Sequence, residues 1–211
     1  MVTKYSSVAT DAEMIKDSTC YLLAGILTAD RLVNLDTLAK VILLALEIAR
    51  EEREGRKIGT IFVVSDSDRV LQDSRCMILD PLIGHSEESL NIDDHNLRET
   101  VKELAQLDGA FIVSDQGKFL SACRYLNATS KNVALPMGLG SRHMAAASIT
   151  RETDAVAVVV SESSIVRVFD NGEIISEIIP EIWLLSRYSL HMEGHYSERS
   201  GDHLTVVSKD T

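Results

Sequence analysis

The stretch Ala155-Val156-Ala157-Val158-Val159-Val160 is an uninterrupted run of small and β-branched apolar residues. A run this short and this apolar is typical of a strand buried on both faces in the middle of a sheet. Two further strands are predicted after it, over 165–170 and 173–179, because the pair Asn171-Gly172 favours a tight hairpin between them. The fold is therefore predicted to be built around a sheet with residues 155–160 near its centre.

Helices and further strands are predicted along the rest of the chain. Apolar residues at helical spacing mark four segments: 12–27, 37–53, 94–107 and 145–152. Apolar runs predict three more strands: 58–64, 110–114 and 119–125. The stretch 66–93 is predicted to be irregular. Strands that lie between and beyond helices predict an α/β fold with a mixed central β-sheet flanked by helices.

The composition is that of a globular chain, with 211 residues of which 45% are hydrophobic and 25% charged. Lys and Arg number 21 against 32 Asp and Glu, so the formal net charge is −11. This charge repels a nucleic-acid backbone or an anionic membrane, and a phosphate ligand must be held by a local cluster. The three cysteines have no metal-ligand spacing, and no apolar stretch approaches the ~20 residues that span a bilayer. We therefore expect a cytoplasmic protein that binds neither nucleic acid nor a membrane.

The segment Gly138-Leu139-Gly140-Ser141-Arg142-His143 opens the alanine-rich helix and is the first candidate for chemistry. Glycines let a backbone approach a ligand closely, and the N–H groups at a helix start attract anions. Ser141 can cap the helix or donate to a phosphate oxygen, and Arg142 offers phosphate a planar fork of donors. His143 can donate to phosphate or hydrogen-bond the backbone. Taken alone, the pattern fits neither a P-loop nor a dinucleotide-binding fingerprint, and a capped helix after a glycine turn is the commoner explanation.

Two shorter motifs carry polar groups at the ends of predicted strands. Asp108-Gly109-Ala110 lies where a helix passes into a strand, a place from which a carboxylate can reach a metal or a sugar hydroxyl. Ser161-Glu162 follows the carboxyl end of the strand over 155–160, where ligands of open α/β sheets gather. Each motif alone also has a plain structural explanation, as a tight turn or as the polar end of a strand.

Taken together and in order, four segments resemble the diadenylate cyclase family: 107–113, 122–126, 140–146 and 154–162. The family has two signature motifs, Asp-Gly-Ala and Arg-His-Arg. The first is intact at 108–110, and the second reads Arg142-His143-Met144. The resemblance implies a diadenylate cyclase domain over 55–182. It leaves 1–54 as an N-terminal helical extension and 183–211 as a C-terminal tail in which no regular element is predicted.

The resemblance implies that two ATP-loaded subunits meet face to face and condense two ATP into cyclic di-AMP and two pyrophosphates. Asp108 would bind the catalytic Mg²⁺ or Mn²⁺ and bring the ribose 3′-hydroxyl toward the α-phosphate of the opposite ATP. Arg142 and His143 would also be catalytic. The implied ATP contacts are Gly109, Ala110, Leu126, Gly140, Ser141, Arg142, His143, Ser161 and Glu162. Because each subunit supplies one ATP, a homo-oligomer that is at least a dimer is implied.

One departure from the family pattern leaves a second interpretation open. Met144 stands where the signature has its second arginine, so one cationic contact is missing or another residue such as Arg151 supplies it. The alternative is a module of the same fold that binds ATP or cyclic di-AMP but turns over slowly. The intact Asp108 argues against it, since a pure sensor has no use for a metal-binding carboxylate beside the ribose. A third interpretation, an interaction domain with coincidental motifs, conflicts with the ordered pair of signatures.

Overall fold

The computed structural model describes residues 23, 25–27, 32–51, 57–127, 133–180, 196–201 and 204–209. The helix predicted over 12–27 lies almost wholly outside these residues, so it stays a prediction. The described elements, in chain order, are α2 (Leu35–Arg50), β1 (Thr60–Val64), α3 (Ser67–Gln72), β2 (Ser74–Cys76), α4 (His95–Leu104), β3 (Ala110–Val113), β4 (Phe119–Leu126), α5 (Ser141–Glu152), β5 (Val156–Val160), β6 (Val166–Asp170), β7 (Glu173–Ile179), β8 (Tyr196–Gly201) and β9 (Leu204–Lys209).

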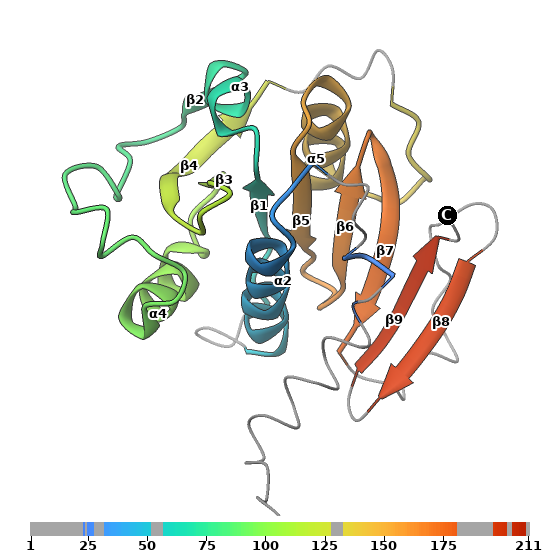
Figure 1. Cartoon of the computed structure of the whole chain (residues 1–211). Coiled ribbons are helices and arrows are strands. Elements are labelled where there is room, and N and C mark those ends of the chain that lie inside the picture. The colour runs from blue at the N-terminus through green and yellow to red at the C-terminus, as the bar shows by residue number, and fades with distance from the viewer. Residues whose placement is uncertain are drawn as a thin grey trace, which may run out of the picture.

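The strands of the described residues form one mixed sheet in the order β2-β4-β3-β1-β5-β6-β7-β9-β8, which can be followed across Figure 1. β1 and β3 run parallel, with Ile61 opposite Ala110, and the other neighbours run antiparallel. β5 lies between β1 and β6, and every one of its residues is buried. The α/β class, the mixed sheet and its buried central strand are thus confirmed.

Two hydrophobic cores lie on opposite faces of this sheet. Because side chains alternate along a strand, Phe62 and Val158 belong to the core that includes α2, whereas Val63 and Val159 pack with the alanines of α5. α2 begins at its N-cap Asn34, whose side chain accepts a hydrogen bond from the backbone N–H of Thr37 at 3.0 Å. The buried residues of α2 pack in the same core as Phe62 and Val158.

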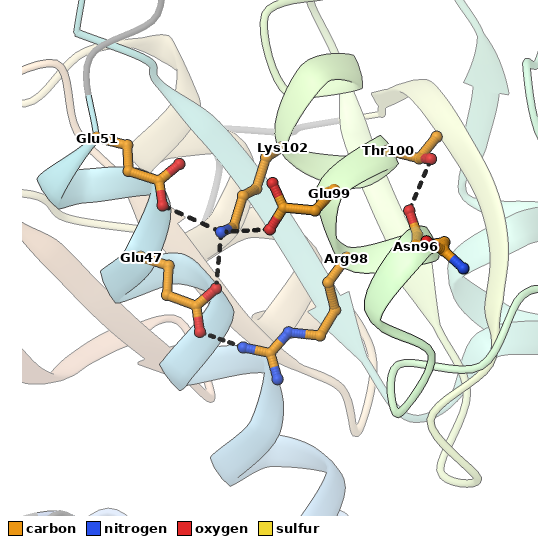
Figure 2. Close-up of polar contacts among 7 residues, drawn as sticks. All are labelled: Glu47, Glu51, Asn96, Arg98, Glu99, Thr100 and Lys102. Carbon is orange, nitrogen blue, oxygen red and sulfur yellow. Dashed lines mark hydrogen bonds and ion pairs between the residues drawn. The ribbon is translucent and has the colours of Figure 1, made fainter. Parts of the chain in front are cut away.

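A cluster of ion pairs joins α4 to α2 (Figure 2). Lys102 on α4 is only 7% exposed, and its Nζ lies 2.9 Å from Glu99 and 3.0 Å from both Glu47 and Glu51. Arg98 also contacts Glu47. Burial lowers the pKa of the Lys102 ammonium, but hydrogen bonds to the three carboxylates outweigh it and raise that pKa above its ordinary value. The cluster anchors the helix whose carboxyl end leads into the Asp-Gly-Ala motif.

Two predictions about local structure were wrong. The stretch 66–93 is not irregular throughout, because it contains α3 and β2, two elements too short to show a hydrophobic period. The chain after residue 183 does contain regular structure, because β9 pairs with β7 and β8 pairs with β9. β8 lies at the edge of the sheet, and its polar sequence gave no sign of a strand.

Among the residues that the structure describes, no helix has both the length and the apolar character needed to cross a bilayer.

Candidate active site

A groove of about 460 Å³ lies where β3, β4 and the start of α5 meet. Six residues predicted from the sequence line it: Asp108, Gly109, Ala110, Leu126, Ser141 and Arg142. Six others complete the lining: Ile61, Met77, Arg124, Tyr125, Met144 and Ala145. The fold therefore brings the Asp-Gly-Ala motif and the start of the second signature to one place, although they lie on different elements.

The Asp-Gly-Ala motif requires glycine at position 109 because of its backbone conformation and the close approach of β4. Its φ is +113°, and a Cβ at this position would lie 2.5 Å from the backbone carbon of Cys123 on β4. Cys123 itself has a φ of +54°, at an irregularity in the pairing of β3 with β4. The absence of a side chain at 109 lets the chain enter β3 against this bulge, which places Asp108 at the rim of the groove.

Arg142 links the two ends of the candidate site. Its Nη1 lies 2.8 Å from Oε1 of Glu162, and its Nη2 lies 3.4 Å from Oδ1 of Asp108. The side chains of Asp108 and Glu162 are 80% and 67% exposed, so both carboxylates also face solvent. One guanidinium thus gathers two carboxylates from distant motifs at the mouth of the groove.

Gly59, which the sequence analysis did not single out, lies directly beside this guanidinium. A Cβ on Gly59 would be 2.5 Å from Nη1 of Arg142 and 3.2 Å from Cγ of Glu162. A glycine next to a strand often marks such a close approach, and its place just before β1 was the available signal. The position of Arg142 therefore depends on a residue that lies in neither signature.

The two carboxylates fit a divalent metal ion. Mg²⁺ is commonly held by one or two carboxylates together with the phosphates of a substrate, and retains several waters. Asp108 and Glu162 both contact the guanidinium of Arg142, so both carboxylates lie at the same cationic group. Within the described ranges, no three His, Cys, Asp or Glu side chains converge as a ligand set.

The start of α5 is open to an anion. Its N-cap is Gly140, and no side chain of the described residues caps this end of the helix. Of the two roles considered for Ser141, the structure does not show capping, since Ser141 is the first helical residue and its side chain is exposed beside the groove. A helix start of this kind presents free backbone N–H groups and a partial positive charge. It is suited to bind phosphate.

Four of the predicted ATP contacts do not line the groove, and one of them, Glu162, is joined to it only through its contact with Arg142. Gly140 precedes the helix and is exposed, and Ser161 contacts Ser163, with 2.9 Å between the hydroxyl oxygens. His143 is buried at 7% exposure, with its Nε2 3.1 Å from Nη1 of Arg167 on β6. The imidazole therefore lies in the core beneath the groove and is not among the residues that line it.

Two groove residues that the sequence analysis left without a role, Arg124 and Tyr125, lie on β4. The guanidinium of Arg124 is held by the carbonyl oxygens of Leu71 and Ser74, at 3.0 and 2.9 Å, so it fastens β4 to the preceding segment. Tyr125 is 45% exposed, and Arg75 lies over its ring at 4.9 Å from the centroid. Met144 also lines the groove, and an apolar side chain thus occupies the place of the signature's second arginine.

Comparisons with known proteins identify the family of this chain. The family model described as "DisA bacterial checkpoint controller nucleotide-binding" matches residues 47–174. A diadenylate cyclase of Methanocaldococcus jannaschii is 49% identical over 150 residues, which cover 71% of this chain and 47% of that protein. A diadenylate cyclase of Haloferax volcanii is 40% identical over 140 residues, which cover 66% of this chain and 51% of that protein. The chain thus spans about half the length of these curated relatives.

A solved structure supports the fold. It is described as a hypothetical membrane spanning protein from Bacillus cereus and aligns with a TM-score of 0.51 at 19% identity. The alignment covers 77% of this chain and 74% of that one. At this identity the likeness concerns the arrangement of helices and strands alone.

Proposed function

This chain belongs to the diadenylate cyclase family, and we propose that it condenses two ATP into cyclic di-AMP and two pyrophosphates. One observation carries the proposal. Arg142, at an open helix start, contacts both the Asp108 of an intact Asp-Gly-Ala motif and Glu162, at the mouth of one groove. A nucleotide triphosphate needs both an anion site and carboxylates for a metal, and this groove offers both.

Asp108 and Glu162 are the residues that would hold Mg²⁺ or Mn²⁺ at the groove. A divalent cation bound there would lower the pKa of the ribose 3′-hydroxyl and offset charge on the phosphates. The chain's own residues supply the rest. The N–H groups that begin α5, the Ser141 hydroxyl and the Arg142 fork would bind phosphate oxygens and stabilise the charge that develops on the departing pyrophosphate. These donors act locally against the overall charge of −11.

The nucleoside would occupy the apolar part of the groove. Leu126 and Ala110 are buried at 3% and 0% exposure, and both line the groove beside the Asp-Gly-Ala motif. Their side chains would pack against adenine, while the phosphates extend toward the start of α5. This arrangement would bring the ribose near Asp108.

We place the reaction between two subunits whose grooves face one another. Each 3′-oxygen forms a bond to the α-phosphorus of the opposite ATP and loses its proton, while the bond from that phosphorus to pyrophosphate breaks. Docking of two loaded subunits supplies the proximity that this double substitution requires. Exposed apolar side chains at the groove support such a contact: Met77 and Tyr125 line it and are 47% and 45% exposed, and Leu107, next to Asp108, is 41% exposed. A separated monomer should be nearly inactive.

A second candidate function is a slow sensor that binds ATP or cyclic di-AMP. The observation in its favour is Met144, an apolar side chain that lines the groove where the family signature has an arginine. The loss of one cation weakens the hold on phosphates. Asp108 nevertheless remains, exposed at the groove, as a carboxylate available for catalysis.

The test is incubation of the purified chain with ATP and Mn²⁺ or Mg²⁺, followed by anion-exchange chromatography and mass analysis of the products. Asp108→Asn should abolish cyclic di-AMP formation while ATP binding changes only a few-fold. Asp36→Asn on α2 is the matched control, because it removes the same charge from a 75% exposed side chain away from the groove. ATP binding without product would favour the sensor. Equal turnover by Asp108→Asn would remove the proposed role of this carboxylate.

A further inference from the structure

Beneath the groove, three polar side chains from three elements form a buried line. Glu177 on β7, Arg167 on β6 and His143 on α5 are 0%, 1% and 7% exposed. Arg167 lies opposite Glu177 in the strand pairing and donates to its Oε1 through Nε. On its other side, Nη1 of Arg167 lies 3.1 Å from Nε2 of His143. We call these residues the buried line.

Stability alone does not account for a buried charge pair at this place. Removing a guanidinium and a carboxylate from water costs several kcal/mol per ion, and apolar residues of similar volume are often at least as stabilising. The ion pair does, however, fix the orientation of the Arg167 guanidinium. A planar guanidinium held through Nε by Glu177 has its remaining N–H groups aimed along set lines, and Nη1 points at His143.

The contact between Arg167 and His143 also fixes the tautomer of the His143 imidazole. A guanidinium donates hydrogen bonds but cannot accept them, so Nε2 of His143 must be the acceptor. The ring is then neutral, with its hydrogen on Nδ1. It packs 6.1 Å from the ring of Phe169, measured between centroids. His143 is thus held in one tautomer and one orientation, inside the core.

His143 belongs to the first turn of α5 and follows Arg142 directly in the chain. Its backbone N–H donates to the carbonyl of Gly140 at 3.1 Å, within the turn that begins the helix. The ends of a helix tend to fray where no side chain caps them, and no described side chain caps this one. A ring locked in the core therefore holds the same turn that presents Ser141 and Arg142 to the groove.

We propose that Arg167, oriented by Glu177, is a positioning residue that acts through His143 to hold the phosphate-binding turn of α5. This inference rests on the proposed function of the groove. Removing the line should leave the sheet folded but allow the first turn of α5 to move. A misplacement of about 1 Å in a binding group can cost on the order of 100-fold in rate. We expect phosphate affinity to suffer more than stability.

The test compares two variants of the full chain that alter opposite sides of β6. Arg167→Met combined with Glu177→Met removes both charges of this ion pair together. Val168→Ala is the matched control, because Val168 is fully buried in the other core, on the α2 side of the sheet. The affinity of each for the α,β-methylene analogue of ATP with Mg²⁺ is measured by calorimetry, and the melting temperature is recorded. Nitrogen-15 spectra of histidine-labelled protein report the tautomer of His143, assigned with His143→Gln.

We expect the double variant to bind the analogue about 10- to 100-fold more weakly than the wild type. Val168→Ala should bind it like the wild type, although its melting temperature falls about as far as that of the double variant. The wild-type spectrum should show His143 neutral with its hydrogen on Nδ1, and the double variant should lose this single tautomer. Wild-type affinity in the double variant, or an unchanged His143 tautomer, would overturn the proposal. If the double variant does not fold, Arg167→Lys keeps a charge beside Glu177, removes the fork and is judged by the same readouts.

The same measurements distinguish a failure of the proposed function from a failure of the role proposed for Arg167. A wild-type chain that does not bind the analogue refutes the nucleotide site and this role together. A wild-type chain that binds it but forms no cyclic di-AMP refutes catalysis alone, and the affinity comparison still decides the role of Arg167.

Discussion

The close approach of Gly59 to Arg142 gives a sharp test of the groove's geometry. In Gly59→Ala the new Cβ would lie 2.5 Å from Nη1 and 3.0 Å from Cζ of Arg142. The guanidinium has to withdraw by about 0.9 Å to restore the 3.4 Å at which ordinary contacts begin. Its contact with Asp108 is already 3.4 Å long, so a displacement of this size breaks it and disturbs the 2.8 Å contact with Glu162.

The expected cost falls on activity and not on stability. The atoms that must yield are the end of a flexible side chain, and Gly59 has no positive φ that an alanine would resist. Replacing glycine by alanine gains about 0.4–1 kcal/mol, which offsets exposed ion pairs worth less than about 1 kcal/mol each. A charge-assisted hydrogen bond from Arg142 to phosphate is worth about 1.5–3 kcal/mol. Its loss lowers kcat/KM roughly 10- to 100-fold.

The assay measures kcat/KM for cyclic di-AMP formation and the melting temperature of each protein. Gly109→Ala is the contrasting variant, since its Cβ would meet the Cys123 backbone at 2.5 Å with φ at +113°. Strain and overpacking there should cost about 2–4 kcal/mol and lower the melting temperature by roughly 5–15 °C. Wild-type kcat/KM in Gly59→Ala would refute the argument. A melting temperature that falls as far as in Gly109→Ala would show that the backbone yields instead of Arg142.

Three further substitutions test the groove and its support. Arg142→Ala should lower kcat/KM by about 100- to 1,000-fold with little change in melting temperature, and unchanged kinetics would exclude the phosphate contact. Met144→Arg restores the signature's second cation and should tighten ATP binding about 10- to 100-fold, the value of one charge-assisted bond; unchanged affinity would show that this side chain does not reach the phosphates. Lys102→Met leaves three carboxylates facing one another and should lower the melting temperature by about 3–9 °C at pH 7, since the partners are partly exposed. Because the folded-state pKa of Lys102 is raised, its stabilisation is complete below the ordinary lysine pKa of about 10.4 and is lost as pH rises beyond it. The difference in melting temperature between the wild type and Lys102→Met should therefore shrink above that pH. A difference that stays constant would contradict the raised pKa of Lys102.

The centre of the fold could be predicted because its signals are local. A buried central strand needs apolar residues on both faces, and the run over 155–160 supplies them without interruption. Asn171 has a φ of +49° and Gly172 of +81°, the backbone that a tight hairpin demands and that this pair of residues tolerates. In both cases the residues that predict the strand or the turn are the same residues that form it.

The surroundings of His143 could not be predicted in this way. In the sequence it stands beside Arg142 and resembles a second phosphate ligand. Consecutive residues of a helix point about 100° apart, so one side chain of the pair lines the groove and the other enters the core. The partner that holds it, Arg167, lies 24 positions away on a strand whose other residues predict an ordinary buried element. Gly59 escaped notice for the same reason, because its contact with Arg142 exists only once β1 and α5 are assembled.

The C-terminal hairpin has a consequence for any attempt to shorten the chain. The family model ends at residue 174, inside β7, yet the part of β7 from Ser176 to Ile179 pairs with β9, and Val206 and Val207 enter the two cores. A chain cut there would lose most of β7 and present the unsatisfied backbone of β6 to solution, and such an edge recruits strands from other molecules. A shortened protein would therefore tend to associate through its sheet edge and obscure the groove-to-groove assembly. The portion that should be kept together extends through Lys209.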